Sequence, residues 1–235
     1  MPFGFNVFGR RRSGAEESDD LSAGVASYEA GLKCQHGGDN AGAARHYARA
    51  EKIFRRLSDK PRLIMCLNNL GNVAANLGEF EIGLAAFKEA ERLCRETGNM
   101  EDLAKVRNNQ GAIHVRRGES AAAAACFEEK EKICRSIGDM RGVGAALANQ
   151  AAAVCEMNEF AKAATLLAEV VQICRRYEEW RGLGSALRNQ ALIALQNGDN
   201  DKAAGLVKEA LSAFEKTDDR QSIAACREML KELGR

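Results

Sequence analysis

The chain has 235 residues, of which 46% are hydrophobic, so it can bury a core and is not a disordered chain. It carries 34 Lys and Arg against 33 Asp and Glu, a formal net charge of +1. This balance argues against a nucleic-acid-binding protein, which usually has a basic stripe or a high pI. Alanine is abundant, aromatic residues are few and there are only two prolines, which favours an all-helical fold.

No apolar run approaches the roughly 18 residues that a membrane span requires. The first eight residues are apolar and aromatic, but the basic stretch Arg10, Arg11 and Arg12 follows them. A secretory signal has the opposite order and a longer apolar run, and Pro2 removes the glycine that myristoylation requires. We therefore expect a cytoplasmic protein.

Residues 1–20 are predicted to form a flexible N-terminal tail, because no helical period is visible in them. Phe3, Phe5 and Phe8 alternate with small or polar residues, like a strand-type peptide ligand. One hypothesis is that this tail occupies a groove of its own chain until a partner displaces it. The alternatives are a weak anchor to a membrane or partner and a disordered terminus.

From Leu21 onward, one pattern recurs every 40 residues. The clearest sign is a row of asparagines at Asn69, Asn109, Asn149 and Asn189. A fixed period over several copies is typical of a repeat array, in which each unit packs on its neighbours. The predicted solenoid covers 21–235, with units 21–60, 61–100, 101–140, 141–180 and 181–220 and a capping helix over 221–233.

Each unit has the pattern of two helices joined by a turn. In the unit from residue 61, apolar residues at helical spacing predict a first helix over 62–76 and a second over 80–96. Gly98 suits the left-handed conformation that closes a helix. Small residues in register would let the first helix approach the second. They are Gly71, Gly111, Ala151 and Ala191.

The cysteines follow the repeat as well. Cys94, Cys134 and Cys174 share a position with Phe54 and Phe214 in other units, which indicates buried, reduced thiols. No Cys-x-x-Cys pair occurs, so we expect no metal site and no cofactor. The histidines lie at unrelated repeat positions without a paired nucleophile, so we do not expect an enzyme.

The pattern of the second unit resembles the tetratricopeptide repeat. The residues that carry the resemblance are Leu67, Leu70, Gly71, Ala74, Gly78, Phe80, Gly83, Phe87 and Ala90. The period is longer than the commoner one of about 34 residues. It is similar to the variant in kinesin light chains and in the repeat regions of bacterial signal-transducing ATPases. The phosphate-binding motif of those ATPases is absent here, so ATPase activity is not expected.

The resemblance implies a right-handed superhelical solenoid, whose first helices line a concave groove that binds an extended peptide or a partner helix. Residues at the groove positions of that family are the candidate peptide-binding residues. They are Asn68, Asn69, Asn72, Asn76, Lys105, Asn108, Asn109, Arg116, Asn149, Arg188 and Asn189. Asn69, Asn72 and Lys105 also resemble part of a clamp for a C-terminal carboxylate, but Asn109 stands where that clamp has an arginine.

The asparagine row has two interpretations. An amide offers donors and an acceptor that match an extended peptide backbone, and Lys105, Arg116 and Arg188 would favour an acidic ligand. The same row could instead bond neighbouring repeats to one another. Beside it, we expect Gln110, Gln150 and Gln190 to make satisfied hydrogen bonds between helices, because an unpaired buried amide costs about 1–3 kcal/mol.

The sequence thus predicts a non-catalytic scaffold that binds a protein or peptide in its groove, with regulation by its own tail as a further hypothesis. Two alternatives stay open. One is a helical solenoid that binds nucleic acid, and the other is a regulatory repeat subunit that works with a separate signalling ATPase. Self-association through the ends of the array is a further hypothesis.

Overall fold

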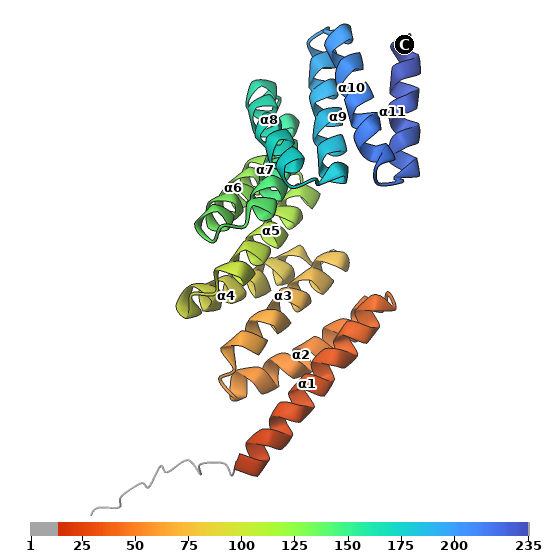
Figure 1. Cartoon of the computed structure of the whole chain (residues 1–235). Coiled ribbons are helices and arrows are strands. Elements are labelled where there is room, and N and C mark those ends of the chain that lie inside the picture. Colours follow the sequence, from red (N-terminus) through yellow and green to blue (C-terminus); the bar gives the residue numbers. More distant parts are fainter. Residues whose placement is uncertain (1–13, 235) are drawn as a thin grey trace, which may run out of the picture. The chain divides into compact units, whose positions relative to one another are not determined.

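The structure is a computed structural model that describes residues 14–234, and these form helices and no strand (Figure 1). Among these residues, no helix is long and apolar enough to span a bilayer. The helices are α1 (Gly14–His36), α2 (Asn40–Arg56), α3 (Lys60–Asn76), α4 (Phe80–Thr97), α5 (Met100–Arg116), α6 (Ser120–Ser136), α7 (Met140–Glu156), α8 (Phe160–Arg176), α9 (Trp180–Gln196), α10 (Asn200–Glu215) and α11 (Arg220–Glu232).

The helices follow the predicted period closely. The expected helices 62–76 and 80–96 are α3 and α4, and the expected cap 221–233 is α11. Helices that follow one another in the chain pack together, as α1, α2 and α3 do, and again from α5 through to α11. The all-helical solenoid of helix-turn-helix repeats is therefore confirmed.

The first helix begins earlier than the sequence pattern indicates. Residues 14–20 belong to α1 and not to a tail that ends at residue 20. Glu16 and Glu17 lie in its first turn, where negative charge stabilises a helix N-terminus, and Asp20 forms an ion pair of 2.5 Å with Arg56 of α2. The hypotheses about Phe3, Phe5 and Phe8 lie outside the described residues.

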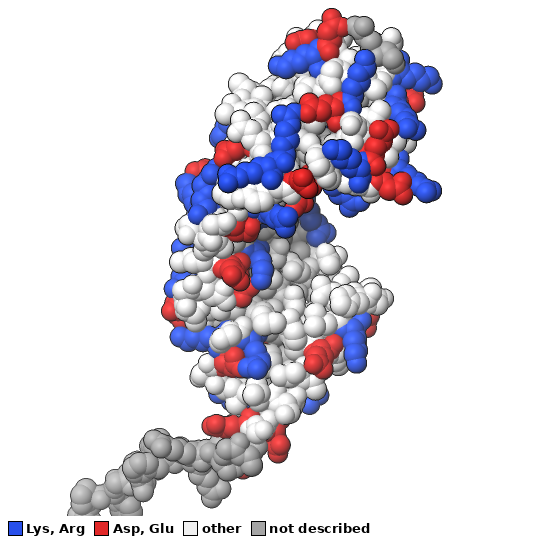
Figure 2. Space-filling view, in the orientation of Figure 1, with Lys and Arg blue, Asp and Glu red and all other residues white. Residues whose placement is uncertain are grey.

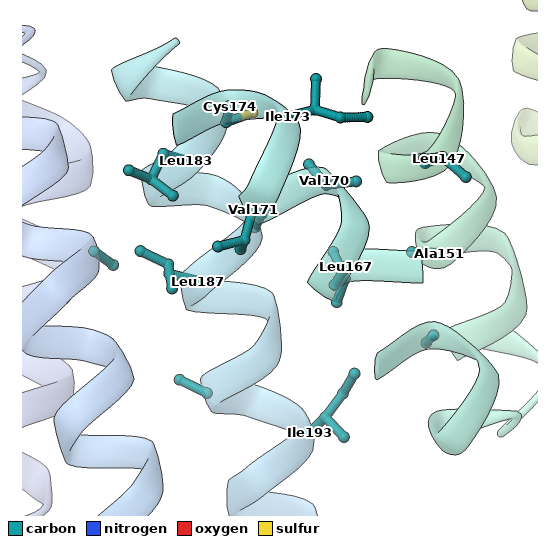
Figure 3. Packing of buried hydrophobic residues seen from close by; sticks show 14 of the residues in the cluster. Leu147, Ala151, Leu167, Val170, Val171, Ile173, Cys174, Leu183, Leu187 and Ile193 are labelled. Atoms are coloured by element: carbon teal, nitrogen blue, oxygen red, sulfur yellow. The ribbon is translucent and has the colours of Figure 1, made fainter. Parts of the chain in front are cut away.

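The chain divides into two compact units, one up to Leu93 and one from Cys94, and the boundary falls within α4. In the first unit, Tyr47 and Phe54 of α2 are buried. In the second unit, α8 lies between α7 and α9 (Figure 3). Its Leu167 and Val170 face Leu147 and Ala151, while Val171 is directed toward Leu183 and Leu187 (Figure 3). The second helix α8 therefore joins two first helices.

Within a repeat, the two helices meet where an aromatic ring faces a glycine. A Cβ atom added to Gly71 would lie 2.6 Å from Cε1 of Phe87, and one added to Gly111 would lie 2.6 Å from Cε1 of Phe127. Both rings are buried. The small residues thus allow the close approach that the sequence predicts.

Caps at the helix ends allow the turns between helices to be short. Asp59, Asn99, Asp139 and Asp219 each accept a backbone N–H from three residues further on, which caps α3, α5, α7 and α11. The residue before α9 is Glu179, and it makes no such bond. Gly98 has a φ of 70°, as expected of the residue that closes α4.

The second helices are joined by a row of ion pairs that the sequence pattern did not single out. Arg55 pairs with Glu89 at 2.5 Å, and Arg135 pairs with Glu169 at 2.6 Å. Arg175 and Glu209 make the same contact one repeat further on. Each pair connects an arginine to a glutamate of the next second helix, and because all are exposed, each contributes little stability.

The predicted core thiols are confirmed. Cys94, Cys134 and Cys174 are buried, and every cysteine in the chain is free. Burial raises the pKa of Cys66 to about 12. These thiols are therefore packing residues.

A comparison of two glycines tests the close approach. Gly111→Ala places a methyl group against the Phe127 ring, and overpacking of this kind costs typically about 1–3 kcal/mol, more than the helix propensity that alanine returns. Gly205 of α10 has open space around it, so Gly205→Ala should raise the free energy of unfolding by up to about 1 kcal/mol. Urea denaturation should show opposite signs for the two variants, and equal stabilisation would contradict the packing argument.

Candidate binding site

Neighbouring first helices are joined by hydrogen bonds from the asparagine row. Nδ2 of Asn69 in α3 donates to the hydroxyl of Tyr28 in α1 over 2.7 Å. Nδ2 of Asn149 in α7 donates to Oδ1 of Asn108 in α5 over 3.2 Å. Tyr28 and Asn108 occupy the same position of the repeat. At these two places, part of each amide is therefore used to hold adjacent repeats together.

The pattern is broken between α7 and α9. The residue equivalent to Tyr28 and Asn108 is Ala148, whose methyl group cannot accept a hydrogen bond. Within residues 14–234, the side chain of Asn189 consequently makes no hydrogen bond. Its full set of donors and acceptor is available to a ligand.

Two pockets lie between α7 and α9, and Asn189 lines both. We call them the Ala148 pocket and the Leu192 pocket. The Ala148 pocket has a volume of about 340 Å³, with small residues of α7 and α9 as walls and Leu167, Val170 and Ile173 of α8 among its apolar lining. An ion pair of 2.8 Å between Arg141 and Glu179 borders it.

The Leu192 pocket is larger and more polar. It has a volume of about 440 Å³ and is lined by Phe160, Leu192 and the polar Glu156, Asn158 and Gln196, among others. Leu192 is 49% exposed. An apolar pocket, a free amide and a mixed pocket thus follow one another along the same two helices.

A comparison with the equivalent gap between α1 and α3 shows why the Ala148 pocket is open. The α1–α3 gap holds a smaller pocket of about 280 Å³ that is lined by Val25, Tyr28, Arg62 and Met65. The equivalent residues of the Ala148 pocket are Ala145, Ala148, Gly182 and Ser185. The gap between α7 and α9 is wider because small side chains stand where the α1–α3 gap has larger ones, while the repeat pattern is the same.

The gap between α5 and α7 is filled by a lysine that the sequence analysis missed. Lys130 of α6 stands where the Ala148 pocket has Val170, and its Nζ donates to Oδ1 of Asn108 over 2.9 Å. Burial lowers the pKa of Lys130, and the charge of Asp139 opposes this effect only in part. The signal was available, because every other unit has alanine or valine at this position.

The positions of the other predicted peptide-binding residues give less support for ligand binding. Lys105 is exposed and pairs with Asp102 of its own helix at 2.8 Å, which reduces its value as a clamp residue. Arg188 lies near Asp219, the residue before α11. The pKa of Asp219 is lowered chiefly by the hydrogen bond from the backbone N–H of Ser222, and the charge of Arg188 adds a smaller effect. The remaining groove candidates are the half-buried Asn68, Asn72 and Asn109 and the exposed Asn76 and Arg116.

The glutamines differ from one another. Oε1 of Gln110 accepts a hydrogen bond of 3.0 Å from Arg107 of the same helix. Oε1 of Gln150 is buried without a hydrogen-bond partner in the described part of the chain. The expected bond between helices is therefore wrong for the oxygen of Gln150, which the buried face of α7 keeps from water and from a donor.

The visible charge distribution does not favour a polyanion. Basic and acidic side chains are interleaved over the helices from α9 to α11, without a continuous basic stripe (Figure 2). In the second unit, several arginines are taken up by ion pairs, among them Arg107 with Glu129 at 2.6 Å. The surface therefore offers no strip of free positive charge there.

The asparagine row can be tested by comparing two of its members. Asn149→Ala removes a bond to Asn108 and should lower the free energy of unfolding by about 1 kcal/mol. Asn189→Ala removes no bond within the described chain and should change it by less than about 0.5 kcal/mol. Urea unfolding of both variants measures the difference, and equal losses would mean that Asn189 also supports the fold.

Lys130 should reduce the stability of the free protein. Its lowered pKa means that the folded state binds the proton less tightly than the unfolded state. Lys130→Met should therefore raise the free energy of unfolding at neutral pH on the order of 1 kcal/mol, a value reduced by partial contact with water. The gain should shrink near pH 10.5, the ordinary pKa of lysine.

The control for this prediction is Lys132→Met on the same helix. Lys132 is 66% exposed and pairs with Glu128, so its replacement should change stability by less than about 0.5 kcal/mol. A destabilised Lys130→Met variant would show that the charge is well accommodated.

Many solved structures share the fold, and three of them have the following likeness to this chain. A signal-transduction ATPase with numerous domains and a tetratricopeptide repeat sensor, from Pyrococcus horikoshii, is 14% identical, with a TM-score of 0.78 over 91% of this chain and 33% of that one. A putative kinesin light chain from Podosopora anserina is 16% identical, with a TM-score of 0.70 over 85% and 98%. A Rap protein complexed with competence and sporulation factor is 13% identical, with a TM-score of 0.68 over 95% and 64%.

The sequence itself gives the family. No curated protein matches it, and the tetratricopeptide repeat model matches residues 63–136 and 143–216, more than half of the chain. These segments coincide with the helix pairs α3–α6 and α7–α10. The expected resemblance is therefore confirmed, and the chain belongs to the tetratricopeptide repeat family.

Proposed function

We propose that the protein is a non-catalytic scaffold that binds an extended peptide segment of a partner protein between α7 and α9. The observation that carries this proposal is Asn189, an amide with no hydrogen bond in the described chain, between two pockets. The tetratricopeptide repeat is generally a non-enzymatic interaction fold. One neighbour of the same fold, a Rap protein, was solved in complex with competence and sporulation factor, which supports a binding role.

The chemistry of the gap fits an extended peptide. The Ala148 pocket is apolar and about 340 Å³ in volume, which suits one large aliphatic or aromatic side chain. The amide of Asn189 can bond a backbone C=O and N–H at the rim. In an extended chain the side chains alternate in direction, so the residue two positions along would reach the Leu192 pocket. Backbone bonds provide affinity, and the pockets provide selectivity.

Asn149 of α7 extends this proposal within the second compact unit. Its amide uses one N–H for Asn108 and retains an oxygen and the other N–H. These groups would add polar contacts for a longer ligand. In this interpretation Asn149 both joins repeats and contacts the ligand.

The proposal can be tested by filling the Ala148 pocket. The probe is a set of peptides selected on the wild-type protein from a random phage-displayed library and then synthesised with a fluorescent label. Ala148→Leu occupies the pocket and should weaken their binding by at least about tenfold, the effect of losing one buried side chain. Asn189→Ala should weaken it by roughly two- to tenfold.

The control is Ala168→Leu, which adds the same volume on an exposed face of α8 and should leave binding unchanged. Fluorescence polarisation gives the affinities, and thermal melting confirms that each variant is folded. Selected peptides that bind Ala148→Leu and Asn189→Ala as tightly as wild type would place the binding site elsewhere.

A further inference from the structure

Lys130 is out of place in the repeat. The equivalent residues of the other units are Ala50, Ala90, Val170 and Ala210, all of them buried. A position that is otherwise apolar therefore carries a charge in only one unit. In the second compact unit, this side chain rises from α6 into the gap between α5 and α7.

Its surroundings satisfy only part of the ammonium group. Nζ donates to Oδ1 of Asn108 over 2.9 Å, and this same oxygen also receives a bond from Asn149. No ion pair to Lys130 is found within residues 14–234. Asp139 acts on it electrostatically, but the carboxylate of Asp139 accepts the N–H of Gly142. Two N–H groups of the lysine are thus left for a further acceptor.

The other lysines and arginines nearby show that this is not the rule. Lys132 pairs with Glu128 at 2.6 Å, and Arg107 pairs with Glu129 at 2.6 Å. A desolvated charge whose protein partner is a neutral amide is unfavourable in the free protein. A carboxylate that reached it would regain the lost electrostatic stabilisation. Lys130 is only half-buried, and Asn149, the other residue bonded to Asn108, is exposed.

We propose that Lys130, together with Asn108 and Asn149, receives a carboxylate of the peptide whose apolar side chain occupies the Ala148 pocket. This inference rests on the proposed function and specifies its ligand. The site uses a second helix and differs from the clamp that Asn69, Asn72 and Lys105 resemble. The carboxylate comes from an aspartate or glutamate side chain or from a free C-terminus.

The fold sets the spacing between the two groups. The α5–α7 and α7–α9 gaps are neighbours, and packed helices lie about 8–10 Å apart. An extended chain covers about 3.3 Å per residue, so the carboxylate and the apolar residue should be about two to four residues apart. A ligand with both groups at that separation contacts both gaps at once.

Peptide selection with two protein variants tests this inference. The phage-displayed random library is selected in parallel on wild type, on Lys130→Met and on Lys132→Met. Wild type and Lys132→Met should enrich peptides with Asp or Glu two to four residues from a large apolar residue. Lys130→Met should retain the apolar preference and lose the acidic one.

A selected peptide then provides a quantitative cycle. Exchange of its Glu for Gln should weaken binding to wild type on the order of tenfold and leave binding to Lys130→Met unchanged, because a hydrogen bond to a charged group is worth about 1.5–3 kcal/mol. Amidation of the peptide's C-terminus distinguishes the two sources of the carboxylate. If amidation weakens binding and the exchange of Glu for Gln does not, the carboxylate belongs to the chain end.

The outcomes separate the two proposals. Selected peptides that depend on Ala148 but show no acidic preference, or the same preference on Lys130→Met, would overturn the carboxylate site alone. Failure to select any peptide that depends on Ala148 or Asn189 would overturn the proposed function and this inference with it. Lys130→Met is a fair test because the substitution removes a half-buried charge and should not impair folding.

Discussion

The fold depends on one contact inside each repeat, in which a large side chain of the second helix faces a small residue of the first. Gly71 and Gly111 leave room for the rings of Phe87 and Phe127, since a Cβ atom at either position would lie only 2.6 Å from a ring carbon. In the fourth unit the same contact pairs Ala151 with the smaller Leu167 (Figure 3). Because the volumes compensate, the two helices stay close, and each pair presents an apolar face that only the next repeat can cover.

Much of the fold was predictable from the sequence, because residues at the same position of each repeat make the same packing contact. The helix pairs, the buried cysteines and the close approach at Gly71 follow from residues in register. The start of α1 at Gly14 was not predictable in this way, because an acidic first turn and the Asp20–Arg56 pair stabilise residues without an apolar period. The ion pairs between second helices, such as Arg55 with Glu89, were not predicted. Their partners are 34 residues apart, a separation that differs from the repeat of 40.

The candidate site was the harder part, because it arises where the repeat is broken. The asparagine row draws attention as a regular feature, yet Asn69 and Asn149 use amide groups to join repeats. The informative residues are the exceptions, Ala148 as a missing acceptor and Lys130 as a charge in an apolar position. A single sequence shows such exceptions, but only the contacts show that Ala148 leaves Asn189 free. In a repeat protein, regular residues build the surface and irregular residues give it selectivity.

The buried thiols have a consequence for how the protein meets oxidants and alkylating reagents. Four of the five helix pairs contain a cysteine, the exception being α9 and α10, and α11 contains Cys226. A thiol reacts as the thiolate, and burial raises the pKa of Cys66, Cys174 and Cys226. Reaction therefore requires the surrounding helices to separate first. The order in which these cysteines are labelled would report which helix pair opens most readily. An adduct on an opened pair would then prevent it from closing, since the packed core has no room for the added group.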